Sequence, residues 1–182
     1  MIVGLLADTH VPHRMAALPP SLFERLDGVD LILHAGDLDD PAILDELGRI
    51  APAQAVRGNF HIQSPWPNDR RLPLFLDIVL AGQRVVVTHG HFSFWNSFWE
   101  KFRMWRSDYR LQVSARIMAR VIRVVPHADV YVFGHTHLAM VRRQAGALFV
   151  NPGAVCPTRY MTPSVARLTL TPDRAKVEIL PL

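Results

Sequence analysis

Short apolar runs in this chain end repeatedly at polar residues that can bind a ligand. Such runs, rich in β-branched residues, predict buried strands, and a following glycine lets the backbone turn sharply. The runs are Ile2 to Leu6 before Asp8 and His10, Leu31 to Leu33 before Gly36 and Asp37, Ala53 to Val56 before Gly58 and Asn59, Val85 to Val87 before His89, and Val130 to Phe133 before Gly134, His135 and His137. Because ligands bind outside the carboxyl ends of the strands in open α/β sheets, we expect these side chains to share one crevice.

Helices are predicted between the first three strands. Pro19-Pro20-Ser21 opens a helix that runs to about Leu26, and Asp39-Asp40-Pro41 reads as an N-cap, with Asp40 as the capping residue, followed by proline at the first position of a helix to about Arg49. Strands that alternate with helices over residues 2 to 57 predict a parallel sheet with right-handed crossovers.

The second half of the chain changes to hairpins. Two of them turn at Ala81-Gly82 and Ala145-Gly146, and a third joins Ser164 to Leu170 with Ala175 to Leu180. We therefore predict a single α/β domain over residues 1 to 182, with two mixed β-sheets packed face to face and helices outside.

Composition fits this prediction and excludes other classes. At 182 residues, 49% hydrophobic and 20% charged, the chain can bury a sizeable core. No run approaches a membrane span, and Ile2 already starts the first strand, so no targeting segment is expected. The single cysteine, Cys156, cannot form an intramolecular disulfide and is expected to be a packed residue in a reducing cytoplasm.

The net charge is +4, and 18 of the 20 cationic side chains are arginine, which suits phosphate contacts or reflects a compositional bias. No basic run with interleaved aromatics occurs outside the segment after His91, so nucleic acid is not the expected partner.

The polar residues at the strand ends form a donor set suited to metals. Seven donors are too many for one first-row cation and suit two, and mixed nitrogen and oxygen ligands favour Mn, Fe, Ni, Zn or Co over Ca or a pure Mg site. Two ions about 3.5 to 4 Å apart can hold a hydroxide and clamp a phosphoryl group. The predicted donors are Asp8, His10, Asp37, Asn59, His89, His135 and His137.

The order of these motifs resembles the calcineurin-like metallophosphoesterase superfamily. The chain shows Asp-x-His, Gly-Asp-x-x-Asp, Gly-Asn, a single His and Gly-His-x-His, and both Thr88-His89-Gly90-His91 and Asn151-Pro152-Gly153 resemble its small bacterial and archaeal phosphodiesterases. The resemblance implies a four-layer αββα sandwich and phosphodiester hydrolysis by a metal-bridging hydroxide, with two transition-metal ions, Mn foremost. It also implies the ligand sets: Asp8, His10 and His137 for one ion, Asn59, His89 and His135 for the other, and Asp37 as the bridge.

The chain departs from this family at the third motif. Many members place a histidine that protonates the leaving group after the asparagine, where this chain has Phe60 followed by His61. The proton donor is therefore His61 or His91, or the leaving group departs with help from metal and water alone. Arg159 and Asn151, which flank a Pro-Gly turn, are candidates for contact with substrate phosphate, and His34, inside a strand, is expected to be a core histidine.

Two other functions remain open at this point. The fold can serve as a non-catalytic binding module, as in the phosphoesterase-like subunit of retromer. A pyrophosphatase acting on a lipid-linked nucleotide is suggested only by the aromatic segment after His91.

Residues 92 to 109 hold eight of the sixteen aromatic residues and predict an amphipathic helical insertion. Its aromatic stripe is interpreted as a homodimer contact, an apolar lid beside the metals, a core-packed helix or a membrane-surface helix. A second helix, capped at Ser107 or Asp108, is predicted to end before Pro126. Its predicted apolar face comprises Leu111, Ala115, Met118, Ile122 and Val125.

Overall fold

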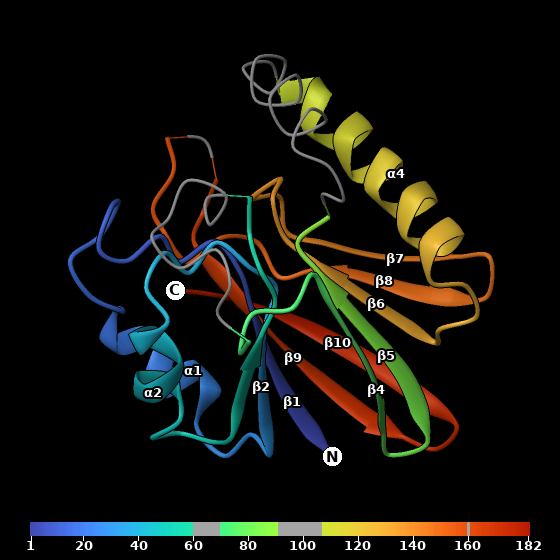
Figure 1. The fold of residues 1–182 in the computed structure, drawn as a ribbon, viewed down its shortest axis with the longest axis horizontal. Coiled ribbons are helices and arrows are strands. Elements are labelled where there is room, and N and C mark those ends of the chain that lie inside the picture. The colour runs from blue at the N-terminus through green and yellow to red at the C-terminus, as the bar shows by residue number, and fades with distance from the viewer. Residues whose placement is uncertain (60–69, 91–106, 160) are drawn as a thin grey trace.

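The computed structural model describes residues 1–59, 70–90, 107–159 and 161–182. The strands of this part of the chain form two five-stranded sheets that pack face to face, with helices on both outer faces (Figure 1). The four-layer sandwich of two mixed sheets is therefore confirmed.

The first sheet has the order β10-β9-β1-β2-β3. Its parallel part consists of β1 (Ile2–Leu6), β2 (Leu31–His34) and β3 (Ala53–Ala55), as the alternation of strands and helices predicts. The hairpin of β9 (Ser164–Thr171) and β10 (Arg174–Pro181) adds to it antiparallel to β1.

The second sheet has the order β4-β5-β6-β8-β7. The hairpins β4 (Phe75–Leu80) with β5 (Gln83–Thr88) and β7 (Met140–Gln144) with β8 (Ala147–Asn151) flank β6 (Val130–Phe133). Since β5, β6 and β8 run parallel, β5 and β6 present their carboxyl ends, with His89 and His135, at the same edge of the sheet.

The main core lies between the sheets and follows the period of two of each strand. Val3 and Leu5 of β1 face this core, whereas Leu6 packs against the helices on the outer face. Those helices are α1 (Pro20–Leu26) and α2 (Ala42–Leu47), which bury Leu22 and Leu47.

Helix α4 (Ser107–Val124) covers the outer face of the second sheet (Figure 1). Its start and end match the prediction, but the predicted apolar face is wrong at Leu111 and Ala115, which are exposed. The other predicted members, Met118, Ile122 and Val125, do pack against the sheet. The buried face is completed by Val113, Ile117 and Val121. The same side also carries the polar residues Arg110, Ser114 and Arg120, whose contacts with the loops below fix the rotation of the helix.

Helix α2 begins at Ala42, one residue later than predicted, while Asp40 Oδ1 accepts a hydrogen bond from the Ala42 N–H at 2.8 Å. The predicted aromatic insertion lies outside the described residues, except for its last residues, Ser107 to Tyr109, at the start of α4. No helix of the described residues is long and apolar enough to cross a membrane.

Candidate metal centre

The carboxyl ends of the strands bring the predicted donors together from both sheets. Each donor lies one to four residues after the end of a strand. All of them are buried except His137, whose side chain is 12% exposed. The first sheet supplies Asp8, His10, Asp37 and Asn59, and the second supplies His89, His135 and His137.

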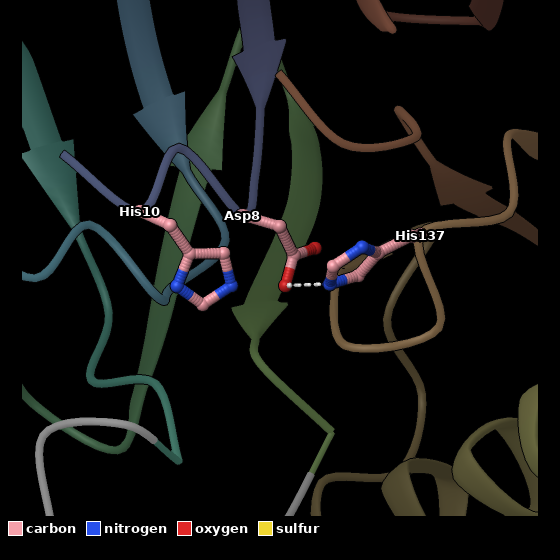
Figure 2. A group of neighbouring side chains, drawn as sticks. All are labelled: Asp8, His10 and His137. Carbon is pink, nitrogen blue, oxygen red and sulfur yellow. Dashed lines mark ion pairs between the residues drawn. The ribbon is translucent and has the colours of Figure 1, made fainter. Parts of the chain in front are cut away.

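A first group consists of Asp8, His10 and His137, whose donor atoms all lie within 4.8 Å of one another. Figure 2 shows the Asp8 carboxylate between the two imidazoles. Asp8 Oδ1 lies 3.2 Å from His137 Nε2, and the two ring centroids are 5.8 Å apart. One carboxylate and two imidazoles, from the segments that follow β1 and β6, thus face a common point.

A second group consists of Asp8, Asp37 and His89. His89 Nε2 lies 3.3 Å from Asp37 Oδ2 and 3.9 Å from Asp8 Oδ1. Asn59 Oδ1 joins this side of the site, because it lies 2.8 Å from His89 Nε2 and 3.1 Å from His135 Nδ1.

The two groups meet at the carboxylates. Asp37 Oδ2 lies 3.6 Å from His10 Nε2 and 3.3 Å from His89 Nε2, so it faces a histidine of each group, as a bridging ligand would. Asp8 belongs to both groups, whereas the predicted ligand sets assigned it to one ion only.

Backbone and carboxylate acceptors fix the orientation of two of the imidazoles. His10 Nδ1 donates to the Asp39 carboxylate at 3.2 Å, and His89 Nδ1 donates to the Ala35 carbonyl at 2.8 Å. In both rings Nε2 therefore points toward Asp37, the arrangement in which an outer acceptor raises the basicity of a ligand histidine.

Asp39 was missed as a site residue by sequence reasoning, which treated Asp39-Asp40 as a helix cap. The two residues differ in the structure: Asp39 is buried against His10 and His13, whereas Asp40 accepts a hydrogen bond from the N–H of Ala42, the first residue of α2. The signal available in the sequence was the position of Asp39, two residues after Asp37 in the same turn.

The electrostatics of the site are those of a crowded anionic pocket. Burial alone would lower the pKa of His89, but the charges of Asp37 and Asp8 raise it to about 9. For Asp8, an acid, burial acts in the opposite direction and raises the pKa. The charges of His137 and His89 outweigh this effect and hold the pKa of Asp8 below its usual value. In the metal-free protein the imidazolium thus compensates the carboxylates, a role that a bound cation takes over when it displaces the proton.

The backbone around the donors is in an uncommon conformation. Asp8, His10, Asp37, Asp39, His135 and His137 all have φ between 50° and 71°. Non-glycine residues rarely adopt this region, and where they do the conformation is held by the surrounding structure. Here the Asp8 N–H donates to the Gly36 carbonyl at 2.9 Å and the His10 N–H donates to the Asp37 carbonyl at 3.0 Å.

Glycines allow these turns to approach each other. A Cβ atom at Gly58 would lie 1.9 Å from Asp37 Oδ1, and one at Gly36 would lie 2.7 Å from His89 Nδ1. Any side chain at these two positions would displace the proposed ligands.

The donor set fits divalent metal ions. Asp8 Oδ1 is buried and accepts no well-aligned hydrogen bond from the described residues, although two imidazole nitrogens lie within 4 Å of it. A buried anionic oxygen in this state is stabilised by a cation. Carboxylate, amide and imidazole donors together are typical of transition-metal sites.

The other predicted residues lie in different surroundings. His34 is a buried core histidine, as expected: its Nδ1 accepts from the Gly36 N–H and its Nε2 donates to Thr9 Oγ1, both at 3.1 Å. Asn151 is buried as well, and its amide donates to the Gly134 carbonyl at 2.9 Å. Arg159 is exposed, and the candidate proton donors His61 and His91 lie outside the described residues.

Cys156 is packed in the interior, and burial raises the pKa of its thiol to about 11. The thiolate form is therefore disfavoured, which fits a structural residue.

Comparison with known proteins agrees with the geometry. Residues 1–173 match the family described as calcineurin-like phosphoesterase superfamily domain. This chain belongs to that superfamily. It is 31% identical over 182 residues to a "probable metallophosphoesterase" of Methanothermobacter thermautotrophicus, covering 99% of this chain and 92% of the relative.

Two further similarities point to a different kind of relative. The chain is 26% identical over 157 residues to vacuolar protein sorting-associated protein 29 of Schizosaccharomyces pombe, covering 85% of this chain and 72% of that protein. The crystal structure of Vps29 from Entamoeba histolytica in complex with Zn²⁺ superposes with a TM-score of 0.69 at 22% identity, covering 100% and 99% of the two chains. The second likeness shows the shared fold.

Proposed function

We propose that this chain hydrolyses phosphodiesters with the help of two divalent transition-metal ions, with Mn²⁺ preferred. The observation that supports this most directly is the convergence of the Asp8, Asp37, His10, His89 and His137 donor atoms into two adjoining groups. Membership of the calcineurin-like superfamily supports phosphoester hydrolysis in general, and the mixed nitrogen and oxygen donors support a transition metal.

In the proposed site Asp8, His10 and His137 hold one ion, Asn59, His89 and His135 hold the other, and Asp37 lies between them. Two bound ions would neutralise phosphoryl charge and activate water. Asp39 and the Ala35 carbonyl keep the Nε2 atoms of His10 and His89 pointing inward, so the donors are in place before a cation arrives.

The proton for the leaving group is assigned to His91 or His61, or to water, since Phe60 stands where the superfamily pattern has a histidine. His91 lies two residues after His89 and His61 two residues after Asn59, so each follows a proposed ligand. Arg159 is the candidate for contact with substrate phosphate. Asn151 donates to Gly134 and Thr136, which favours a role in holding the loop that bears His135 and His137.

The proposal is tested with metal-stripped protein that is reconstituted with Mn²⁺, Ni²⁺, Zn²⁺ or Mg²⁺ and assayed on phosphodiesters. We expect hydrolysis to return with a transition metal, Mn²⁺ first, and to be weaker with Mg²⁺. Absence of hydrolysis with every metal, at full metal occupancy, would contradict the proposal.

A comparison of aryl and alkyl diesters tests the leaving group. Without a histidine directly after Asn59, esters of nitrophenol should react much faster than alkyl esters, which need a proton at the departing oxygen. His61→Ala and His91→Ala should be measured beside His127→Ala, a change at an exposed residue remote from the site. Equal rates on both esters, with the alkyl reaction lost in His61→Ala alone, would assign the acid role to His61.

A non-catalytic binding module is the second candidate, because the chain resembles Vps29 in sequence and fold. Metal binding without hydrolysis in the reconstitution experiment would favour this candidate. A cytoplasmic location and a homodimer contact through residues 92 to 109 stay predictions.

A further inference from the structure

A groove outside the metal centre lies between helix α2, the edge strand β3 and the chain that leads into β4. Its volume is about 640 Å³, which is typical of pockets that hold small organic ligands. None of the described residues that line the groove is a proposed metal ligand, so it forms a site of its own.

The less exposed side chains of the groove are apolar. Leu44 of α2 is buried, and Ala53, Pro73 and Leu76 are half-buried. These four residues come from a helix and from the edges of both sheets, so the groove spans the open side of the sandwich. A flat apolar group that covers them removes apolar surface from water, which favours binding.

The exposed side chains of the groove are mostly cationic. Arg49 follows α2, and Arg70 and Arg71 precede β4. Arg71 lies 3.9 Å from the one acidic lining residue, Asp45, and both side chains are more than half exposed, so this ion pair is weak. Neither Arg49 nor Arg70 has an ion-pair partner in the part of the chain that the structure describes. Three arginines and one aspartate give these lining residues a net charge of +2, which attracts a multiply charged anion.

The edge of β3 is too short to take a peptide as a further strand. Just beyond its carboxyl end the Arg57 N–H donates to the Pro73 carbonyl at 2.7 Å, so the chain before β4 already pairs with this part of the edge. The strand itself comprises three residues, which offer few backbone groups for strand addition. The groove therefore suits a compact ligand better than an extended chain.

We propose that this groove binds a nucleotide, with its phosphates at the arginines and its base against the apolar side chains. A guanidinium group presents several N–H donors in a fixed fork that matches phosphoryl oxygens. The Gln54 side chain, exposed at the groove, offers an amide donor and acceptor to the edge of a base. The inference does not depend on the proposed hydrolysis, because the nucleotide is a ligand of the groove and not a substrate of the metal centre.

The test titrates the full-length protein with ADP by calorimetry. Excess EDTA keeps the metal centre empty, so that metal ions there cannot hold phosphates. We expect ADP to bind at least tenfold more tightly than adenosine or inorganic pyrophosphate, because each of these lacks half of the proposed contacts. Pyrophosphate that binds as tightly as ADP would overturn the inference, since the apolar side chains would then contribute nothing.

Substitutions at the arginines separate this site from the metal centre. The double variant Arg49→Met, Arg70→Met should weaken ADP binding about tenfold or more, as loss of charge-assisted hydrogen bonds does. Its Mn²⁺ content and its rate of diester hydrolysis should be unchanged, because neither residue lies at the proposed ligands. Arg123→Met, at an exposed arginine of α4, is the matched control and should bind ADP as the wild type does.

Three results would overturn the inference even if the protein hydrolyses diesters. They are the absence of ADP binding, wild-type affinity for ADP in the double variant, and a glutamate-rich peptide that binds more tightly than ADP and requires the same arginines. The last result would assign the groove to an acidic segment of a partner protein. Arginine-dependent ADP binding without any diester hydrolysis would instead support the groove and contradict the proposed function.

Discussion

The two ends of the strands place residues in the left-handed region for different reasons. Far from the metal centre, the hairpins β4-β5 and β7-β8 turn at Ala81-Gly82 and Ala145-Gly146, where both residues of each pair have positive φ. This is the geometry of a type I′ turn, whose twist matches that of the flanking strands. At that end the conformation is required by the turn alone.

At the metal end the same region is occupied by acidic residues and histidines. The turns after β1, β2 and β6 hold Asp8, Asp37 and His135 with positive φ although no hairpin requires it. The conformation directs their side chains into one crevice, and contacts between different turns maintain it, such as the hydrogen bond from the His135 N–H to Asp8 Oδ2 at 3.1 Å. We therefore expect that strain at the hairpins can be relieved without loss of activity, whereas strain at the metal end should be tied to the proposed function.

The largest effect is expected at the carboxylate between the two ligand groups. Asp37→Asn removes the negative charge that faces a histidine of each group, so at least one ion should bind weakly. Because metal ions contribute several kcal/mol to stabilising a phosphoryl transition state, hydrolysis should fall about a thousandfold or more. Enzyme kinetics with metal analysis check this, with Asp77→Asn on β4 as the control. Full activity at unchanged metal content would rule out a two-metal mechanism.

A smaller effect is expected at the residue that orients His10. Asp39→Asn weakens the acceptor of the His10 Nδ1–H, and changes of this kind lower metal affinity about 10- to 100-fold. Competition with a chelator measures it. The neighbouring Asp40→Asn is the matched control, since an asparagine can still accept the hydrogen bond from the Ala42 N–H and should leave metal affinity unchanged. Equal affinity in both variants would show that Asp39 does not orient a ligand.

The local pattern predicted the elements, and the place of the candidate donors at one edge of the sheets, because both depend on short stretches of chain. A run of β-branched residues ends at a defined position, and the residue after it, such as Asp8 or His135, necessarily lies at the sheet edge. The two hairpins could be predicted for the same reason, since in each an Ala-Gly pair separates two runs that are long enough to form strands.

The rotation of α4 and the partners of the donors could not be predicted in the same way. The apolar count placed Leu111 and Ala115 on the buried face, yet Arg110 and Ser114 bind Thr136, and Leu111 and Ala115 point toward solvent. Likewise, Asp39 and Asp40 are neighbours with identical side chains, and only the positive φ of Asp39 places it against His10. Contacts between segments far apart in the sequence decide both features.

The stability of the metal-free protein should depend on pH through a residue at the metal end of the strands, His89. The pKa of His89 is raised from 6.5 to about 9 in the folded state, so its protonation stabilises the fold. That contribution is fully present below pH 6.5 and is lost as the pH rises through about 9. Urea unfolding of metal-stripped protein between pH 6 and pH 10 should therefore show falling stability, and His89→Asn should lack this fall. Metal binding should follow the opposite trend and tighten with rising pH, because the ion displaces the proton.

The smallest effect is expected at the hairpin end. Ala81 has a φ of 48°, a conformation that asparagine tolerates better than alanine does. Ala81→Asn should therefore raise the free energy of unfolding by about 0.5 to 1 kcal/mol, and it should leave kcat and metal content unchanged. Ala145→Asn, with a φ of 51° in the β7-β8 hairpin, should behave in the same way. Urea unfolding and steady-state kinetics of both variants check this. A loss of activity in either variant would mean that strain at the hairpins is also tied to function, and the contrast between the two ends of the strands would fail.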